Sequence, residues 1–128
     1  MRKYRKDGFI MAIIMVKRAG EDMIEELDIP ASKGFERMRE IIDGYIECVH
    51  IIDPAYSLTM YVDEDGINKE LPLNFKIKTN NPFYPVQDIL GTVCFARGRI
   101  IDDEIEYTDL TEEDKLIIMN LIERGLRL

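Results

Sequence analysis

The run FIMAIIMV, residues 9–16, is apolar throughout and is bounded by charged residues. A run of this length that is rich in isoleucine and valine is typical of a strand buried on both faces of a sheet, and it is short for a helix. We therefore place residues 9–16 in the middle of a sheet. Lys17 and Arg18 follow at once, no small-x-small cleavage pattern appears, and the run is too short to span a membrane. We expect a cytoplasmic protein with reduced cysteines.

Residues 32–43 have the spacing of an amphipathic helix. Their apolar side chains recur every three to four residues, so one stripe of the helix should lie on a sheet. Ser32 is the expected N-cap, because its hydroxyl can accept a hydrogen bond from a free backbone N–H, and Gly44 is the expected end. The predicted core around this helix contains Ile13, Phe35, Met38, Ile41, Val49 and Leu58.

A second helix is predicted near the end of the chain. Thr111-Glu112-Glu113-Asp114 resembles a capping box, and Gly125 is a typical end signal. Between Leu116 and Ile122 only Asn120 is polar, so this helix should be buried. It can pack against its own sheet or form a homodimer through the C-terminal helix, and the sequence leaves both open.

The remaining patterned segments predict strands. Asp65-Gly66 indicates a tight hairpin, and Arg97-Gly98-Arg99 indicates a turn. The order of the segments predicts an α+β fold, with two helices packed on an antiparallel or mixed sheet of about five strands. Besides residues 9–16, the expected strands are residues 23–29, 45–52, 58–62, 92–96 and 100–107.

Charge is distributed unevenly along the chain. The 128 residues include 46% hydrophobic and 33% charged residues, a globular composition, and the formal net charge is -8. Arg2, Lys3, Arg5 and Lys6 contribute +4, which leaves -12 for the rest. We therefore expect a basic N-terminal tail at residues 1–8 and a single α+β domain at residues 9–128. Such an acidic domain repels phosphates, which disfavours nucleic acid as a partner.

Few groups of residues in the sequence could form a catalytic or metal-binding site. Cys48, Cys94 and His50 cannot assemble a structural zinc site. Cys48 and His50 lie two apart on one predicted strand, about 7 Å from each other, which is too far for a base to activate a nucleophile. We expect Cys48 in the core. Residues 63–65 lack the spacing of a calcium loop. We therefore predict no catalytic residue, no metal and no cofactor. An enzymatic function is disfavoured, because no set of nucleophile, base and orienting residue is visible.

Two surfaces are candidates for binding. The irregular segment 79–85 is the first candidate, because binding residues concentrate on loops held by a rigid scaffold. Cations and aromatic residues in the same half of the chain could form a positive cleft for an anionic small molecule, although scattered cations that merely solvate an acidic protein are the favoured explanation. The set comprises Asn74, Lys76, Lys78, Phe83, Tyr84, Arg97 and Arg99. The second candidate is an acidic protein-interaction face formed by Asp102, Asp103, Glu104 and Glu106.

The order of these pieces resembles a known family. The similarity is carried by Asp43-Gly44-Tyr45-Ile46-Glu47, by Asp63-Glu64-Asp65-Gly66, by Leu71-Pro72-Leu73-Asn74 and by Ile89-Leu90-Gly91. This pattern is similar to that of domain of unknown function 3846, and it extends over residues 10–98. The resemblance implies an origin in a bacteriophage or mobile element and implies no activity. Gly44, Gly66, Gly91 and Asn74 are turn-forming types, so we expect structural roles for them.

The hypothesis that follows is a non-enzymatic binding module. Its partner would be a protein encoded by the host or by the element, recognised through the acidic face. The alternative hypothesis is a binder of an anionic small molecule such as a nucleotide.

Overall fold

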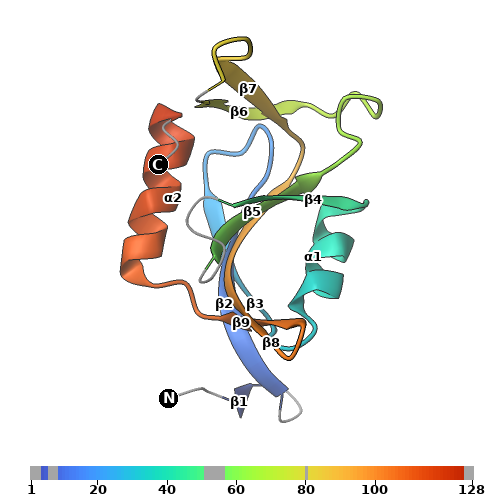
Figure 1. The fold of residues 1–128 in the computed structure, drawn as a ribbon, viewed down its shortest axis with the longest axis vertical. Coiled ribbons are helices and arrows are strands. Elements are labelled where there is room, and N and C mark those ends of the chain that lie inside the picture. Colours follow the sequence, from blue (N-terminus) through green and yellow to red (C-terminus); the bar gives the residue numbers. More distant parts are fainter. Residues whose placement is uncertain (1–3, 6–8, 51–56, 80, 126–128) are drawn as a thin grey trace.

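The computed structural model describes residues 4–5, 9–50, 57–79 and 81–125. A twisted sheet lies between two helices, with α1 covering one face and α2 the other, and a two-stranded sheet lies across one end (Figure 1). The predicted α+β class, with two helices on an antiparallel sheet, is confirmed. The described elements are β1 (Tyr4–Arg5), β2 (Phe9–Lys17), β3 (Ile24–Pro30), α1 (Gly34–Ile42), β4 (Ile46–His50), β5 (Ser57–Asp63), β6 (Leu73–Lys78), β7 (Val86–Leu90), β8 (Val93–Ile101), β9 (Glu104–Thr108) and α2 (Glu112–Arg124).

Strand β2 holds the larger sheet together. The sheet runs β1-β2-β8-β5-β4, with β3 paired to β2 and β9 paired to β8, and every one of these pairs is antiparallel. Ala12, Ile14 and Val16 are fully buried on one face, and Met15 is buried on the other. The prediction of a central strand buried on both faces is therefore confirmed. Within the N-terminal segment, Tyr4 and Arg5 pair with Ile10 and Phe9.

The sheet divides the apolar side chains into two cores. The α1 core includes Ile14, Ile29, Met38 and Tyr107, whereas the α2 core includes Leu58, Met60, Phe95, Ile118 and Leu121. The single predicted core was wrong. Met38 and Ile41 contact the α1 core, but Val49 and Leu58 belong to the opposite face, because successive residues along a strand point to opposite sides of the sheet. Phe35 is 36% exposed and Ile13 is only partly buried.

Helix α1 begins and ends differently from the prediction. Lys33 is its N-cap and makes no side-chain capping hydrogen bond, so Ser32 is not the cap. The helix ends at Asp43, which adopts the left-handed conformation at φ 61°, one residue before Gly44. A Cβ atom on Gly34 would lie 2.5 Å from Ile29 Cδ1, so close packing against β3 fixes the start of the helix.

Helix α2 follows its sequence signals closely. The Thr111 side chain accepts a hydrogen bond from Asp114 N, and the Asp114 carboxylate accepts one from Thr111 N, which completes the capping box. Gly125 ends the helix at φ 64°. Ile118 and Leu121 fill the α2 core, whereas Leu116 is 71% exposed. Among the described residues, no helix is long and apolar enough to cross a membrane.

Two predicted chain reversals differ in the structure. Asp65-Gly66 does not close a hairpin, because β6 pairs with β7 and not with β5. The Asp63 carboxylate instead accepts hydrogen bonds from Asp65 N and Lys69 Nζ, and it organises a longer loop. Residues 97–99 are not a turn either, because β8 continues to Ile101 and Gly98 packs directly against Tyr107. The chain reverses at Asp102 and Asp103.

Candidate functional site

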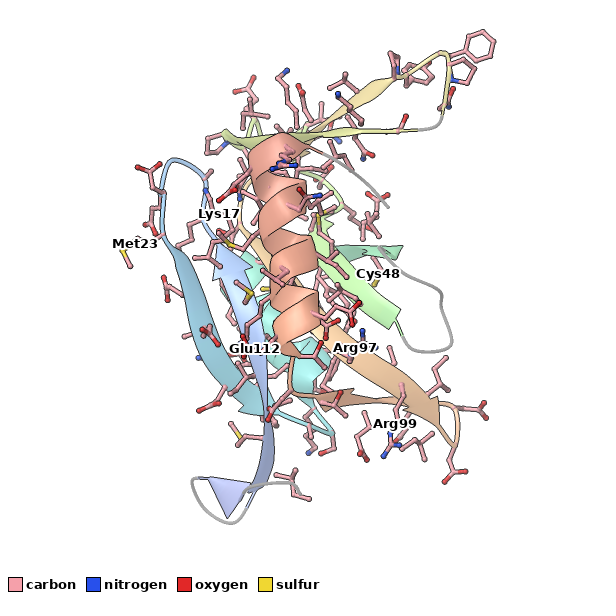
Figure 2. The ribbon with its side chains drawn as sticks, turned by 90° about the vertical axis from the view of Figure 1, so that its left-hand side faces the viewer. Lys17, Met23, Cys48, Arg97, Arg99 and Glu112 are labelled. Atoms are coloured by element: carbon pink, nitrogen blue, oxygen red, sulfur yellow. The ribbon has the colours of Figure 1, made fainter. Side chains whose placement is uncertain are left out.

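The cations predicted to form one cleft lie in two separate regions. Lys76 and Lys78 lie on β6, in the two-stranded sheet at one end of the molecule. Arg97 and Arg99 lie on β8. Arg97 is beside the first turn of α2, and Arg99 lies further from that helix (Figure 2). A single positive cleft is therefore not formed. The cleft required the fold to bring these cations together, but β6 pairs with β7 in the two-stranded sheet, whereas β8 lies in the larger sheet.

Several of these cations already have anionic partners. Lys76 Nζ lies 2.9 Å from Asp88 Oδ1, and Arg99 Nη2 lies 3.7 Å from Glu106 Oε1. Arg97 donates from Nε and Nη2 to the two carboxylate oxygens of Asp114, at 2.7 and 2.5 Å. These pairs reduce the positive charge that an anionic ligand would encounter.

The Arg97–Asp114 pair ties the sheet to the start of α2. Asp114 is 1% exposed. Its burial alone would raise the pKa of its carboxyl, but hydrogen bonds from Arg97 and Thr111 outweigh burial and lower the pKa below its usual value. Burial of the carboxylate is therefore compensated by a charged partner and by the helix cap.

Asn74 has a structural role. Its side-chain amide donates to Lys17 O and to Gly91 O, both at 2.8 Å, and its oxygen accepts from Lys17 Nζ at 3.1 Å. These bonds join β6 to the end of β2 and to the turn before β8. Gly91 adopts φ +75°, and a Cβ there would lie 2.8 Å from Leu71 Cδ1. Two of the segments that carry the family resemblance, residues 71–74 and 89–91, thus meet at this junction.

A second junction involves Gly44. Lys69 Nζ donates to Asp63 Oδ2 at 2.7 Å and to Asp43 O at 3.2 Å. A Cβ on Gly44 would lie 2.6 Å from Asp63 Oδ2 and 2.7 Å from Lys69 Nζ. A side chain at this position would have to displace the ion pair, which passes directly over the Gly44 backbone.

The segment 79–85 forms the tip of the β6–β7 hairpin. Thr79 Oγ1 donates to Tyr84 O at 2.5 Å and accepts from Asn81 N at 3.2 Å, and Asn81 Oδ1 accepts from Phe83 N at 2.9 Å. Phe83 and Tyr84 are exposed on this tip. Lys76 and Tyr84, two of the predicted ligand-binding residues, line an open hollow of about 700 Å³ behind it.

The four acidic residues predicted to contact a protein lie on one hairpin. Asp102 and Asp103 form its two-residue turn at φ 50° and 64°, and Glu104 pairs with Ile101 directly after the turn. Glu106 lies further along β9, opposite Arg99. The predicted acidic cluster is therefore brought together at the β8–β9 turn.

The same hairpin exposes apolar residues that the sequence interpretation missed. Ile100 and Ile105 face each other across the two strands and are 68% and 41% exposed. Phe35 and Ile105 line an open hollow of about 440 Å³ at the base of the hairpin. The signal available in the sequence was Glu104-Ile105-Glu106, in which an isoleucine stands between two carboxylates, a pattern typical of a strand with one apolar face.

Cys48 is exposed, so its predicted place in the core was wrong. It lies on β4, which pairs with β5 alone among the described strands, and α1 does not extend over it. Partial burial and Glu47 raise the pKa of the Cys48 thiol. Cys94 is buried, which raises its pKa to about 12. The side chain of His50 lies outside the described residues.

Carboxylates dominate a further open hollow beside α1, of about 820 Å³. It contains Arg39, which stacks on the Tyr45 ring at 5.0 Å, and Lys69. Within the part of the chain that the structure describes, no group of three or more histidine, cysteine, aspartate or glutamate side chains is arranged to hold a metal ion. The carboxylates of this hollow are Glu36, Glu40, Asp43, Glu64 and Asp65.

Comparison with known proteins identifies a family for this architecture. Neither the curated proteins nor the solved structures contain a match to the chain. A family profile described as a domain of unknown function, DUF3846, matches residues 11–124. The match includes α2, which the resemblance seen in the sequence did not reach. Because the match covers most of its length, the chain belongs to the DUF3846 family.

Proposed function

We propose that this protein is a non-enzymatic binding module that engages another protein through the β8–β9 hairpin. The observation that carries the proposal is the combination of exposed isoleucines and a rim of carboxylates on one projecting element. Ile100 and Ile105 offer apolar area, and Asp102, Asp103 and Glu104 surround the turn. Exposed apolar surface rimmed by charge is typical of protein interaction sites.

The chemistry of the hairpin specifies its partner. Apolar contacts supply most of the binding free energy at interfaces, while charged rims speed association and exclude partners of the same sign. The partner should therefore present an apolar groove flanked by lysine or arginine. In line with the family resemblance, we propose that it is a host or element-encoded protein in a bacterial cytoplasm, and that this chain originates from a phage or mobile element.

The test is capture of partners from bacterial lysate by the purified protein at rising salt. We expect a retained protein that is lost when Ile100→Asp and Ile105→Asp are combined. Leu116→Asp is the matched control, because it changes a similarly exposed residue on α2. Asp102→Lys with Asp103→Lys should weaken capture at low salt most strongly, since salt screens surface charges. Identical capture by all variants would refute the proposal.

The alternative function, binding of an anionic small molecule such as a nucleotide, is supported by the β6–β7 tip. Exposed Phe83 and Tyr84 could stack on a base, and Lys76 lines the hollow behind them. A ligand present at one hundred times its dissociation constant should stabilise the fold by about 2.7 kcal/mol. A thermal-shift screen with nucleotides tests this, with Lys76→Ala as the variant that must abolish any shift and Arg99→Ala as the control from the other region.

A further inference from the structure

Strand β3 lies at an edge of the larger sheet, as far as the described strands are concerned. All seven residues of β3 pair with β2, and no other described strand pairs with it. Figure 2 shows the strand that follows Met23 at the margin of the molecule, with side chains and no ribbon beyond it. An edge of this length can accept a further strand through backbone hydrogen bonds.

The register identifies which backbone groups point outward. Ala31 N donates to Ile10 O at 2.9 Å, so residues at even spacing from Ala31, such as Ile29, turn their backbone groups toward β2. Ile13 N, which lies opposite Asp28, points away from β3 and donates to Asp109 Oδ1 at 2.8 Å. The N–H groups of Ile24 and Glu26 therefore point outward, and no described residue accepts a hydrogen bond from them.

Acidic side chains surround this edge. Arg18 pairs with Glu25, and Lys115 Nζ lies 2.8 Å from Glu26 Oε1, so these two cations offset only part of the negative charge. Charges on an edge strand prevent self-pairing, because like charges on adjacent strands repel. A second copy of β3 is thus a poor occupant, and a basic strand is a favourable one. The exposed carboxylates are Glu21, Asp22, Glu25, Glu26 and Asp28.

We propose that β3 binds an extended, basic segment of a partner protein as an added strand. The outward backbone groups of Ile24 and Glu26 supply hydrogen bonds, and lysine or arginine at alternate positions of the segment lies on one face of the sheet, beside the carboxylates of Glu26 and Asp28. This surface is separate from the β8–β9 hairpin, so the proposal does not depend on the function proposed for the hairpin.

The experiment uses a synthetic peptide of alternating lysine and valine as the probe and one of alternating glutamate and valine as its control. Glu26→Pro removes the outward N–H without removing a hydrogen bond to β2, and proline is tolerated on edge strands. Glu26→Thr is the matched variant, because it removes the same charge and keeps the N–H. Wild type and Glu26→Thr should bind the lysine peptide, and Glu26→Pro should bind it about fivefold to tenfold more weakly than Glu26→Thr.

Amide hydrogen exchange on wild-type protein provides a second measurement that needs no variant. The lysine peptide should slow exchange at Ile24 and Glu26 and leave exchange on β4, the opposite edge of the sheet, unchanged. Equal binding by Glu26→Pro and Glu26→Thr, or unchanged exchange at Ile24 and Glu26 despite binding, would show that charge alone attracts the peptide and would overturn strand addition. Absence of binding to wild type at low salt would overturn it as well.

Discussion

At the residue scale, Asp114 makes two stabilising interactions. It completes the N-terminal cap of α2, and its carboxylate pairs with the Arg97 guanidinium. Asp114→Asn keeps the shape of the side chain but leaves the partly buried guanidinium without its counter-charge. We expect the free energy of unfolding to fall by about 3 kcal/mol, measured by urea denaturation. Glu113→Gln, an exposed carboxylate in the same helical turn, should change it by less than about 0.5 kcal/mol.

The lowered pKa of Asp114 also predicts how this stabilisation depends on pH. A carboxyl whose pKa is lower in the folded state stabilises the fold above its ordinary pKa of 3.8, and the contribution is lost as pH falls through the folded-state value. The difference in unfolding free energy between wild type and Asp114→Asn should therefore be constant near neutral pH and should shrink below about pH 4. A difference that stays constant down to pH 2 would contradict this assignment.

Gly44 is constrained by close contact rather than by a left-handed backbone. Gly44→Ala would force its Cβ against the Asp63–Lys69 ion pair. We expect the free energy of unfolding, measured by thermal or chemical denaturation, to fall by about 2 kcal/mol, which is a typical cost of overpacking. Ser32→Ala is the informative comparison, because Ser32 does not cap α1 and its substitution should be nearly neutral.

At the scale of elements, the β8–β9 turn retains backbone strain. Both turn residues have positive φ, a conformation that aspartate and asparagine tolerate but that only glycine adopts without steric cost. Asp102→Asn with Asp103→Gly should stabilise the protein by about 1 kcal/mol, seen as a higher Tm. Asp102→Asn with Asp103→Asn removes the same charges without adding glycine. A larger gain from the glycine variant would assign the effect to backbone strain.

At the scale of the whole molecule, substitutions in α2 distinguish a monomer from a homodimer. Ile118 is fully buried in the α2 core, so Ile118→Glu should unfold the protein, as seen by circular dichroism. Leu116 and Met119 are the exposed apolar residues of this helix, and a homodimer through α2 would have to use them. Sedimentation of wild type and of Leu116→Glu with Met119→Glu decides: a wild type that is monomeric at micromolar concentration rules out the dimer.

The candidate site was predictable where local chemistry defines it. The carboxylates at residues 102–106 cluster because they are adjacent in the sequence, whereas the cations at residues 76–78 and 97–99 could meet only through the tertiary fold. They do not meet, because β6 belongs to the two-stranded sheet and β8 to the larger sheet. Similarly, Cys48 was misplaced because an apolar residue pattern does not reveal whether a strand lies at the edge of a sheet.

The sequence by itself determined the central strand at residues 9–16, the α2 cap at Thr111 and Asp114, and the α+β class, because these follow from periodicity and from bonds within a few residues. The tertiary structure alone decided which core each strand face joins, that Asp63 binds Lys69 over Gly44, and that β3 has an open outer edge. The physical reason is that strand order and register depend on contacts between residues far apart in the chain, which no local pattern encodes.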